Sequence, residues 1–160
     1  MAYKVFISHS ARPEEWAFIN QVLGRVSPLG VQCYMAEHDL QAGVVLNDKL
    51  RDRIRQSDCV LALITKNSVK SDWVKWEVGA ASGFGKLVIP VVELGVQVPV
   101  FLLNKEHIKF DPHNSAATAQ AVSQYLVKLK LEQDKQQLVG WGLPFRQLRC
   151  CGRRHLLRFP

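Results

Sequence analysis

The run VLALI (Val60–Ile64) is apolar at every position, and this pattern decides how the fold is interpreted. A strand with one solvent-facing side alternates apolar and polar residues, whereas a strand covered on both faces is apolar throughout. Three other short runs are nearly as continuous in hydrophobicity, namely Val5–Ile7, Val31–Met35 and Leu87–Val92. Together the four runs predict a parallel sheet that is covered by helices on both sides.

Segments with helical features separate and follow these runs. Pro13–Val26 starts with a proline and two acidic residues, which favours a helix start, and further helices are expected over residues 47–56, around 73–77 and over 115–139. His107–Phe110 is expected to form a fifth strand at the edge of the sheet. This alternation predicts an α/β fold, a flavodoxin-like three-layer sandwich whose five-stranded parallel sheet has the order 2-1-3-4-5.

Two further expectations concern single residues, namely a proline within a strand and the buried faces of two helices. Pro90 is unusual in a central strand and is expected to mark a bulge or the strand's end. Residues expected to be buried on the first helix are Trp16, Ile19, Leu23 and Val26, and on the last helix Val122, Leu126, Leu129 and Leu131.

Composition bounds the class of protein. A chain of 160 residues with 48% hydrophobic and 22% charged residues is ordinary for one soluble domain. We see no apolar run of about 20 residues and no signal peptide, so a cytoplasmic protein without membrane contact is expected. Cys33 and Cys59 lie in apolar runs and are expected to be reduced core residues, and no metal site is predicted.

The basic charge is concentrated at the carboxyl end. The net charge is +7, but residues 140–160 hold five of the 21 lysines and arginines and none of the 14 acidic residues. The remainder of the chain is therefore nearly neutral, which makes nucleic-acid binding an unfavoured interpretation. We expect a domain over residues 1–139 and a basic tail over residues 140–160.

Glu77 is the most informative polar residue of the chain. Within SDWVKWEVGAASGFG (Ser71–Gly85), helical spacing places Glu77 on one apolar face with Trp73, Trp76, Ala80, Ala81 and Phe84. A glutamate in that position loses hydration, which costs free energy unless a positive charge or a hydrogen bond compensates it. It is either a ligand-facing carboxylate beside a stacking aromatic ring or a glutamate at the edge of the core.

The predicted strand order brings other polar residues to the same place. In this order the chain reverses between the first and third strands, and ligands bind at the carboxyl ends of the strands there. Ser8, His9 and Ser10 follow the first strand, and residues 65–72 follow the third and lead directly to Glu77. The loop over residues 37–46 can close over the same crevice, and Gly43 is either a hinge or an ordinary turn glycine.

Four motifs carry a resemblance to a known family. FISHS (Phe6–Ser10), DLQAG (Asp39–Gly43), SDWVKWE (Ser71–Glu77) and HIKFD (His107–Asp111) occur in this order along the chain. The sequence resembles the TIR (Toll/interleukin-1 receptor) domain family, and within it the prokaryotic stand-alone members that cleave NAD+. Several of those relatives have an arginine soon after the first motif, where this chain has Ser10 and then Arg12. Some carry an acidic or aromatic residue in the loop, where this chain has Gln41 and Val45.

The resemblance implies an activity and a set of site residues. It implies cleavage of the nicotinamide–ribose bond of NAD+ to ADP-ribose or a cyclic isomer, in anti-phage signalling, with Glu77 as the catalytic residue. NAD+ is then the substrate and no cofactor is expected. It further implies self-association through residues 37–46 and a separate effector that responds to the nucleotide product. The implied substrate-binding residues are Phe6, Ser8, His9, Ser10, Arg12, Asp39, Gln41, Gly43, Val45 and Trp73.

Purely structural roles remain open as alternatives for several of these residues. Trp73 is otherwise a core tryptophan, His9 a cap of the strand end, and Arg12 a solvated residue at a helix start. For the whole protein, one alternative is a non-catalytic TIR adaptor, and another is a nucleoside deoxyribosyltransferase-like enzyme that uses a glutamate against a ribosyl centre. A phosphorelay receiver is excluded, because Ser8, His9 and Ser10 stand where a receiver has paired acids.

Overall fold

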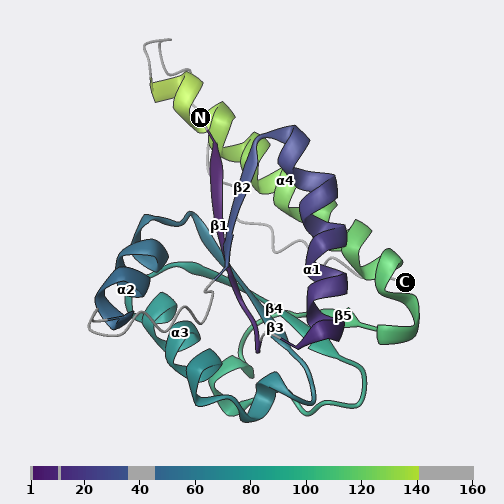
Figure 1. Ribbon diagram of the computed structural model, residues 1–160. Coiled ribbons are helices and arrows are strands. Elements are labelled where there is room, and N and C mark those ends of the chain that lie inside the picture. Colours follow the sequence, from purple (N-terminus) through teal and green to yellow (C-terminus); the bar gives the residue numbers. More distant parts are fainter. Residues whose placement is uncertain (1, 11, 36–45, 141–160) are drawn as a thin grey trace.

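A computed structural model describes residues 2–10, 12–35 and 46–140 of the chain. Its centre is a parallel sheet of five strands in the order β2-β1-β3-β4-β5 (Figure 1). This is the predicted order and confirms the flavodoxin-like α/β fold. The strands are β1 (Tyr3–Ser8), β2 (Val31–Met35), β3 (Cys59–Ile64), β4 (Leu87–Glu93) and β5 (Ile108–Phe110).

Four helices cover the two faces of this sheet. The helices are α1 (Pro13–Val26), α2 (Leu46–Gln56), α3 (Asp72–Gly83) and α4 (Ser115–Gly140). Helices α1 and α4 pack together on one face, and α2 and α3 on the other (Figure 1). Short 3-10 turns precede β2, α3, β5 and α4. Among the residues that the structure describes, no helix combines the length and the apolar character needed to cross a membrane.

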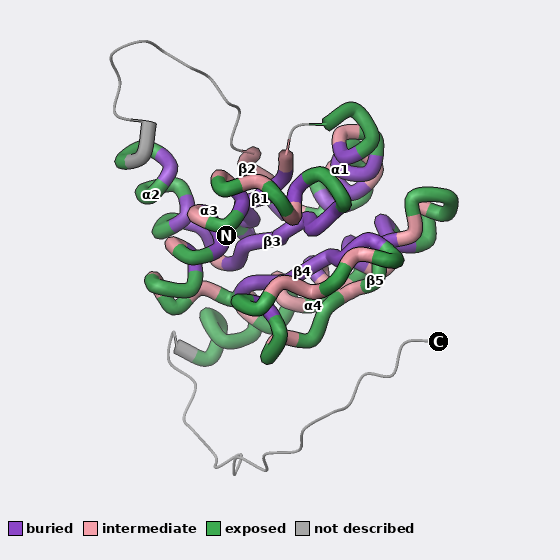
Figure 2. The backbone as a smooth tube through the Cα atoms, turned by 90° about the horizontal axis from the view of Figure 1, so that it is seen from below, coloured by how far each residue is buried: buried purple, intermediate pink, exposed green. Residues whose placement is uncertain are grey.

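Alternation along the strands divides the core into two parts. Val5 and Ile7 of β1 pack toward α1 and α4, whereas Phe6 packs on the opposite face toward α2 and α3. All six residues of β3 are buried, which agrees with a strand that is covered on both sides (Figure 2). Ser8, the last residue of β1, therefore belongs to the same layer as Phe6.

Two predicted apolar faces need correction. On α1, Trp16 and Leu23 are only half-buried, while the side chains that meet the core include Glu15, Phe18 and Val22. The predicted face was thus rotated about the helix axis, and of its four members Ile19 and Val26 are buried as expected. On α4, Leu131 is 52% exposed, because the carboxyl end of this helix extends beyond the sheet (Figure 1).

Pro90 lies inside β4 and does not end it. On one side it pairs with Ala62 of β3, and on the other side the pairing with β5 begins only at Val91. Because β5 is so short, Pro90 has no strand neighbour on that side and its missing N–H disturbs no pairing there. The expectation of a bulge or a strand end at Pro90 was therefore wrong.

Gly30 shows where the turn before β2 requires glycine. Its φ is +80°, its N–H donates to Ser27 O, and a Cβ at this position would lie 2.9 Å from Cε of Lys130. Gly30→Ala should therefore lower the free energy of unfolding in urea by about 1 kcal/mol. Gly24→Ala is the matched control, since Gly24 is helical with open space around its Cβ, and it should be neutral or stabilising. Equal losses in both variants would contradict this account.

Candidate active site

The carboxyl end of β1 contacts helix α3 through one short hydrogen bond. The hydroxyl of Ser8 donates to Oε2 of Glu77 over 2.5 Å, and both residues are 0% exposed. Ser8 faces α3 because it lies two positions after Phe6, which packs in the same layer. The predicted meeting of the first strand with Glu77 at this edge of the sheet is thus observed.

Helix α3 begins so that Glu77 points inward. Ser71 is the N-cap and its hydroxyl accepts a hydrogen bond from the Val74 N–H over 3.4 Å. The buried face of α3 consists of Val74, Glu77, Val78 and Ala81. Trp73 and Trp76 are half-buried on its flanks, with ring centroids 5.8 Å apart, so the predicted face was displaced while the position of Glu77 on it was right.

Burial changes the protonation of Glu77. The loss of hydration raises the pKa of this carboxyl group to about 7, while hydrogen bonds from Ser8 and Trp73 act in the opposite direction. Near neutral pH both protonation states are therefore populated. A carboxylate with such a pKa, held in place by a hydroxyl and an indole, is typical of catalytic sites more than of structural ones.

A second buried carboxylate, that of Glu15 on α1, lies at the same end of β1 in the other layer. Glu15 is 1% exposed and accepts hydrogen bonds from the Ser10 N–H over 2.7 Å, from the Ser10 hydroxyl over 2.8 Å and from the Thr65 hydroxyl. From the sequence, Glu15 was expected only as one of the two acidic residues at the start of this helix. Its spacing of three, four and seven residues from Phe18, Ile19 and Val22 could have indicated that it faces inward.

The remaining predicted site residues are buried, exposed or outside the described part of the chain. His9 is buried, with Nδ1 4.0 Å from Oε2 of Glu15 and its ring edge-on to Trp16, and Phe6 lies entirely within the core beneath this end of the strand. Arg12 is exposed at the N-cap of α1. The predicted residues of the loop lie outside the described part of the chain, namely Asp39, Gln41, Gly43 and Val45.

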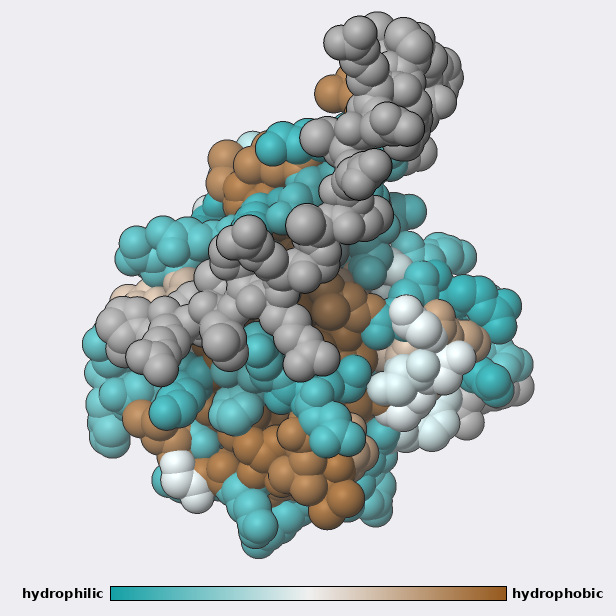
Figure 3. Space-filling model, turned by 180° about the vertical axis from the view of Figure 1, so that it is seen from behind, coloured by the Kyte–Doolittle hydropathy of each residue, from teal (hydrophilic) through white to brown (hydrophobic). Residues whose placement is uncertain are grey.

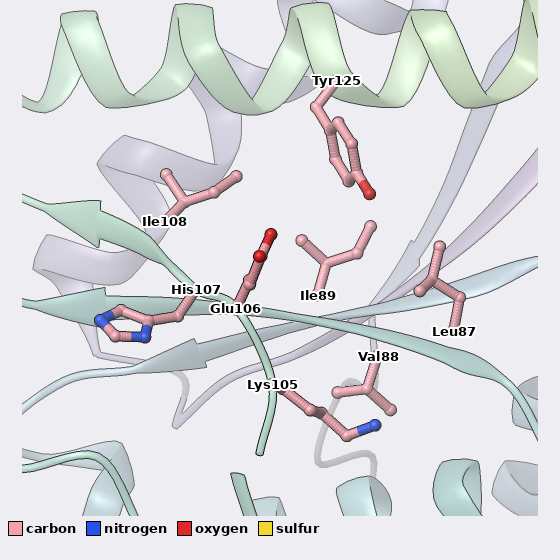
Figure 4. Close-up of a pocket in the computed structure, with 8 residues that line it drawn as sticks. All are labelled: Leu87, Val88, Ile89, Lys105, Glu106, His107, Ile108 and Tyr125. Atoms are coloured by element: carbon pink, nitrogen blue, oxygen red, sulfur yellow. The ribbon is translucent and has the colours of Figure 1, made fainter. Parts of the chain in front are cut away.

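A separate cavity of about 300 Å³ opens at the other edge of the sheet, near the amino ends of β4 and β5 (Figure 4). Tyr125 points into it from α4, and Glu106, Ile89 and Ile108 point toward Tyr125 from the strand side. Burial raises the pKa of Tyr125, and the negative charges of nearby residues, including Glu106, act in the same direction. This cavity shares no residue with the Ser8–Glu77 contact.

The segment between β4 and β5 exposes apolar side chains to solvent. Hydrophobic residues reach the surface in the space-filling view (Figure 3). In this segment Val100 is 84% exposed, and Leu94, Phe101 and Leu103 are also exposed. Clusters of exposed apolar side chains often mark contact sites for other proteins.

Removing the Ser8 hydroxyl should raise the pKa of Glu77 further. In Ser8→Ala the carboxylate loses a donor that favours its charged form, so the pKa moves above about 7. A ¹³C NMR titration of the glutamate carboxyl groups measures this change. Ser57→Ala is the matched control, because the hydroxyl of this buried serine bonds only to Ile54 O in the helix before β3. An unchanged Glu77 titration in Ser8→Ala would contradict the assigned contact.

The fold and this edge of the sheet together define a class of protein, a flavodoxin-like α/β domain with a buried glutamate beside the end of its first strand. The sequence profile of the TIR domain family matches residues 5–126. The chain therefore belongs to the TIR domain family.

Solved structures of other proteins share this fold. The TIR domain of a Toll-related receptor from Hydra magnipapillata has 17% identity and a TM-score of 0.58, over 83% of this chain and 98% of that one. A metazoan TIR-STING receptor from C. gigas has 27% identity and a TM-score of 0.55, over 74% of this chain but only 39% of the receptor. A CMP N-glycosidase from Clostridium botulinum shares the fold with 15% identity and a TM-score of 0.59, over 76% of this chain and 98% of that one. No curated protein matches this chain.

Proposed function

We propose that this TIR domain is an NAD+ nucleosidase that cleaves the nicotinamide–ribose bond, with Glu77 as its catalytic residue. The observation that carries the proposal is the buried carboxylate of Glu77, whose pKa is raised to about 7 and which the Ser8 hydroxyl holds at the end of β1. Ligands of doubly wound α/β folds bind at this edge of the sheet, next to the strand where the chain reverses direction.

The chemistry of NAD+ cleavage requires only one carboxylate. Oxidised nicotinamide is a cationic ring that leaves without being protonated, and the ribosyl carbon then carries positive charge, as in glycoside hydrolysis. An ionised Glu77 stabilises that charge more strongly in a site without water than it could in bulk solvent. The half-buried Trp73 offers a flat face for a ring of the substrate, a contact of about 1 kcal/mol.

The described conformation is closed around Glu77. Because this residue is 0% exposed, NAD+ can meet its carboxylate only after neighbouring groups have moved. The substrate-binding roles of Ser8, His9, Ser10 and Arg12 belong to that open state, as do those of the loop residues Asp39, Gln41, Gly43 and Val45. Water as the acceptor gives ADP-ribose, whereas attack by another atom of the same molecule gives a cyclic isomer.

The biological setting that we propose is prokaryotic anti-phage signalling in the cytoplasm. A diffusible nucleotide product would act on a separate effector, and self-association through residues 37–46 would assemble the active form. Membership of the TIR domain family is the observation that supports this setting.

The experiment that tests the activity is a product analysis. Concentrated protein is incubated with NAD+ over a series of protein concentrations, and nicotinamide, ADP-ribose and cyclic products are resolved by mass spectrometry. Nicotinamide release together with either ribosyl product supports the proposal. Intact NAD+ at every concentration, with release of base from nucleosides or nucleotides instead, would redirect it to the N-glycosidase and deoxyribosyltransferase class.

A non-catalytic interaction domain is the second candidate function. The exposed Leu94, Val100, Phe101 and Leu103 favour it, because this apolar segment suits contact with a second copy of the chain. Sedimentation at increasing concentration would show self-association. That result combined with no NAD+ turnover in the assembled state would select this function over the enzyme.

A further inference from the structure

Glu15 is a buried carboxylate that accepts hydrogen bonds from two turns near Glu77. Its carboxylate accepts from the N–H and the hydroxyl of Ser10, in the turn after β1, and from the hydroxyl of Thr65, directly after β3. Burying a carboxylate costs several kcal/mol unless donors replace the lost water. The first turn of α1, at the positive end of the helix dipole, is a favourable place for a carboxylate.

The partner of Glu15 on the β3 side is itself fixed in orientation. The Thr65 hydroxyl oxygen accepts the Ser68 N–H over 3.1 Å, and the Thr65 N–H donates to the Ser68 hydroxyl oxygen over 2.6 Å. The hydroxyl of Ser68 donates in turn to Leu63 O over 2.6 Å. Thr65 therefore presents its proton to Glu15 from a rigid turn, and this turn leads within a few residues to Ser71, the N-cap of α3.

These contacts connect the chain segments that surround the candidate active site. On one side, Ser8 of β1 donates to Glu77 of α3. On the other side, Glu15 joins Ser10, two residues after Ser8, to Thr65, in the turn that leads into α3. The two buried carboxylates come from helices on opposite faces of the sheet, and the end of β1 lies between them.

We propose that Glu15 is a positioning residue for Glu77: it fixes the turn after β1 to the turn after β3, so that Ser8 keeps its hydrogen bond to the Glu77 carboxylate. Glu15 acts through Ser8 and does not touch the reacting atoms. The kinetic part of this inference rests on the proposed NAD+ cleavage. The structural part, the effect of Glu15 on Glu77, holds for any ligand.

The test compares Glu15→Gln with Glu14→Gln. Glutamine has nearly the shape of glutamate, but an NH2 group replaces one of its two acceptor oxygens. Either the Ser10 N–H, which donates to Oε2, or the Ser10 and Thr65 hydroxyls, which donate to Oε1, then lose their acceptor. Glu14→Gln makes the same change of charge one residue earlier, at an exposed position of the first turn of α1. In Glu15→Gln we expect kcat to fall 10- to 100-fold, because the carboxylate of Glu77 is displaced. We expect KM to stay within about threefold of its original value. Glu14→Gln should match the unsubstituted protein.

A readout without substrate separates this inference from the proposed function. In a ¹³C NMR titration of the folded proteins, the Glu77 midpoint should rise in Glu15→Gln, because the Ser8 donor is no longer held, and should stay unchanged in Glu14→Gln. If the protein never cleaves NAD+ but this midpoint moves, the enzyme proposal fails and the positioning role stands. An unmoved midpoint in folded Glu15→Gln overturns the positioning role, whatever the activity.

Thr65 supplies a second variant in case Glu15→Gln does not fold. Thr65→Val keeps the shape of the side chain but removes the hydroxyl, and it should raise the Glu77 midpoint and lower kcat in the same direction. Thr65→Ser restores the hydroxyl and should return both quantities to the values of the unsubstituted protein. Failure of serine to restore them would show that valine acts through packing, and this would overturn the role of the Thr65–Glu15 contact.

Discussion

Replacing Glu77 with glutamine should lower NAD+ turnover about 1,000-fold or more. The amide cannot carry the negative charge that stabilises the ribosyl cation, and groups that stabilise charge in a site without water are typically worth 10²- to 10³-fold or more. The fold should be retained, because the side chain keeps its size and Ser8 can still donate to the amide oxygen. Nicotinamide release at saturating NAD+, followed by mass spectrometry, measures the loss.

Glu106→Gln is the matched control for this variant. Glu106 is an exposed glutamate beside the cavity at the opposite edge of the sheet, so the same chemical change there should leave turnover unaltered. A near-ultraviolet circular dichroism spectrum confirms that both variants keep their packing. Undiminished turnover in folded Glu77→Gln would end the assignment of Glu77 as the catalytic residue.

Stability should fall as the pH rises from about 4.5 to 7, owing to Glu77. Its pKa is about 7 in the folded protein and 4.5 when the group is free in water, so the folded state holds this proton more tightly. Below pH 4.5 both states are protonated and the group has its full stabilising effect. That effect is lost as the pH rises through the folded pKa, and it amounts to about 3 kcal/mol at 1.36 kcal/mol per pH unit.

The measurement is the difference between the unsubstituted protein and Glu77→Gln. Urea denaturation at several pH values gives the free energy of unfolding of each, and groups that titrate in both proteins cancel in the difference. Relative to the variant, the unsubstituted protein should lose stability across this window and stay level above about pH 8. A difference that does not vary with pH would show that Glu77 is not desolvated as described.

A parallel sheet covered on both faces could be predicted from the sequence because its strands are apolar along their whole length. Every residue of the run Val60–Ile64 is apolar, and the strand that contains it is buried throughout. Pro90 was misinterpreted because its effect depends on where β5 begins to pair, and that information is not local. The exposure of Leu131 likewise depends on how far α4 extends past the sheet (Figure 1).

Only part of the candidate site could be predicted from the sequence. Glu77 could be found because a carboxylate among aromatic residues contradicts the hydrophobic pattern, and Ser8 because topology places it at the switch point. Glu15 was missed because an acidic residue in the first turn of a helix is ordinary and needs no other explanation. Its burial results from Ser10 and Thr65, which only the folded chain brings to it. The roles of Asp39, Gln41, Gly43 and Val45 stay predictions.

The placement of Glu15 and Glu77 on helices from opposite layers has a consequence for how the protein responds to any molecule bound there. Such a molecule would contact both layers of helices and would bind only when both are folded. It would therefore stabilise the two layers together against local unfolding. Amide hydrogen exchange should then slow in α1 and α3 together, although the sheet keeps these helices apart.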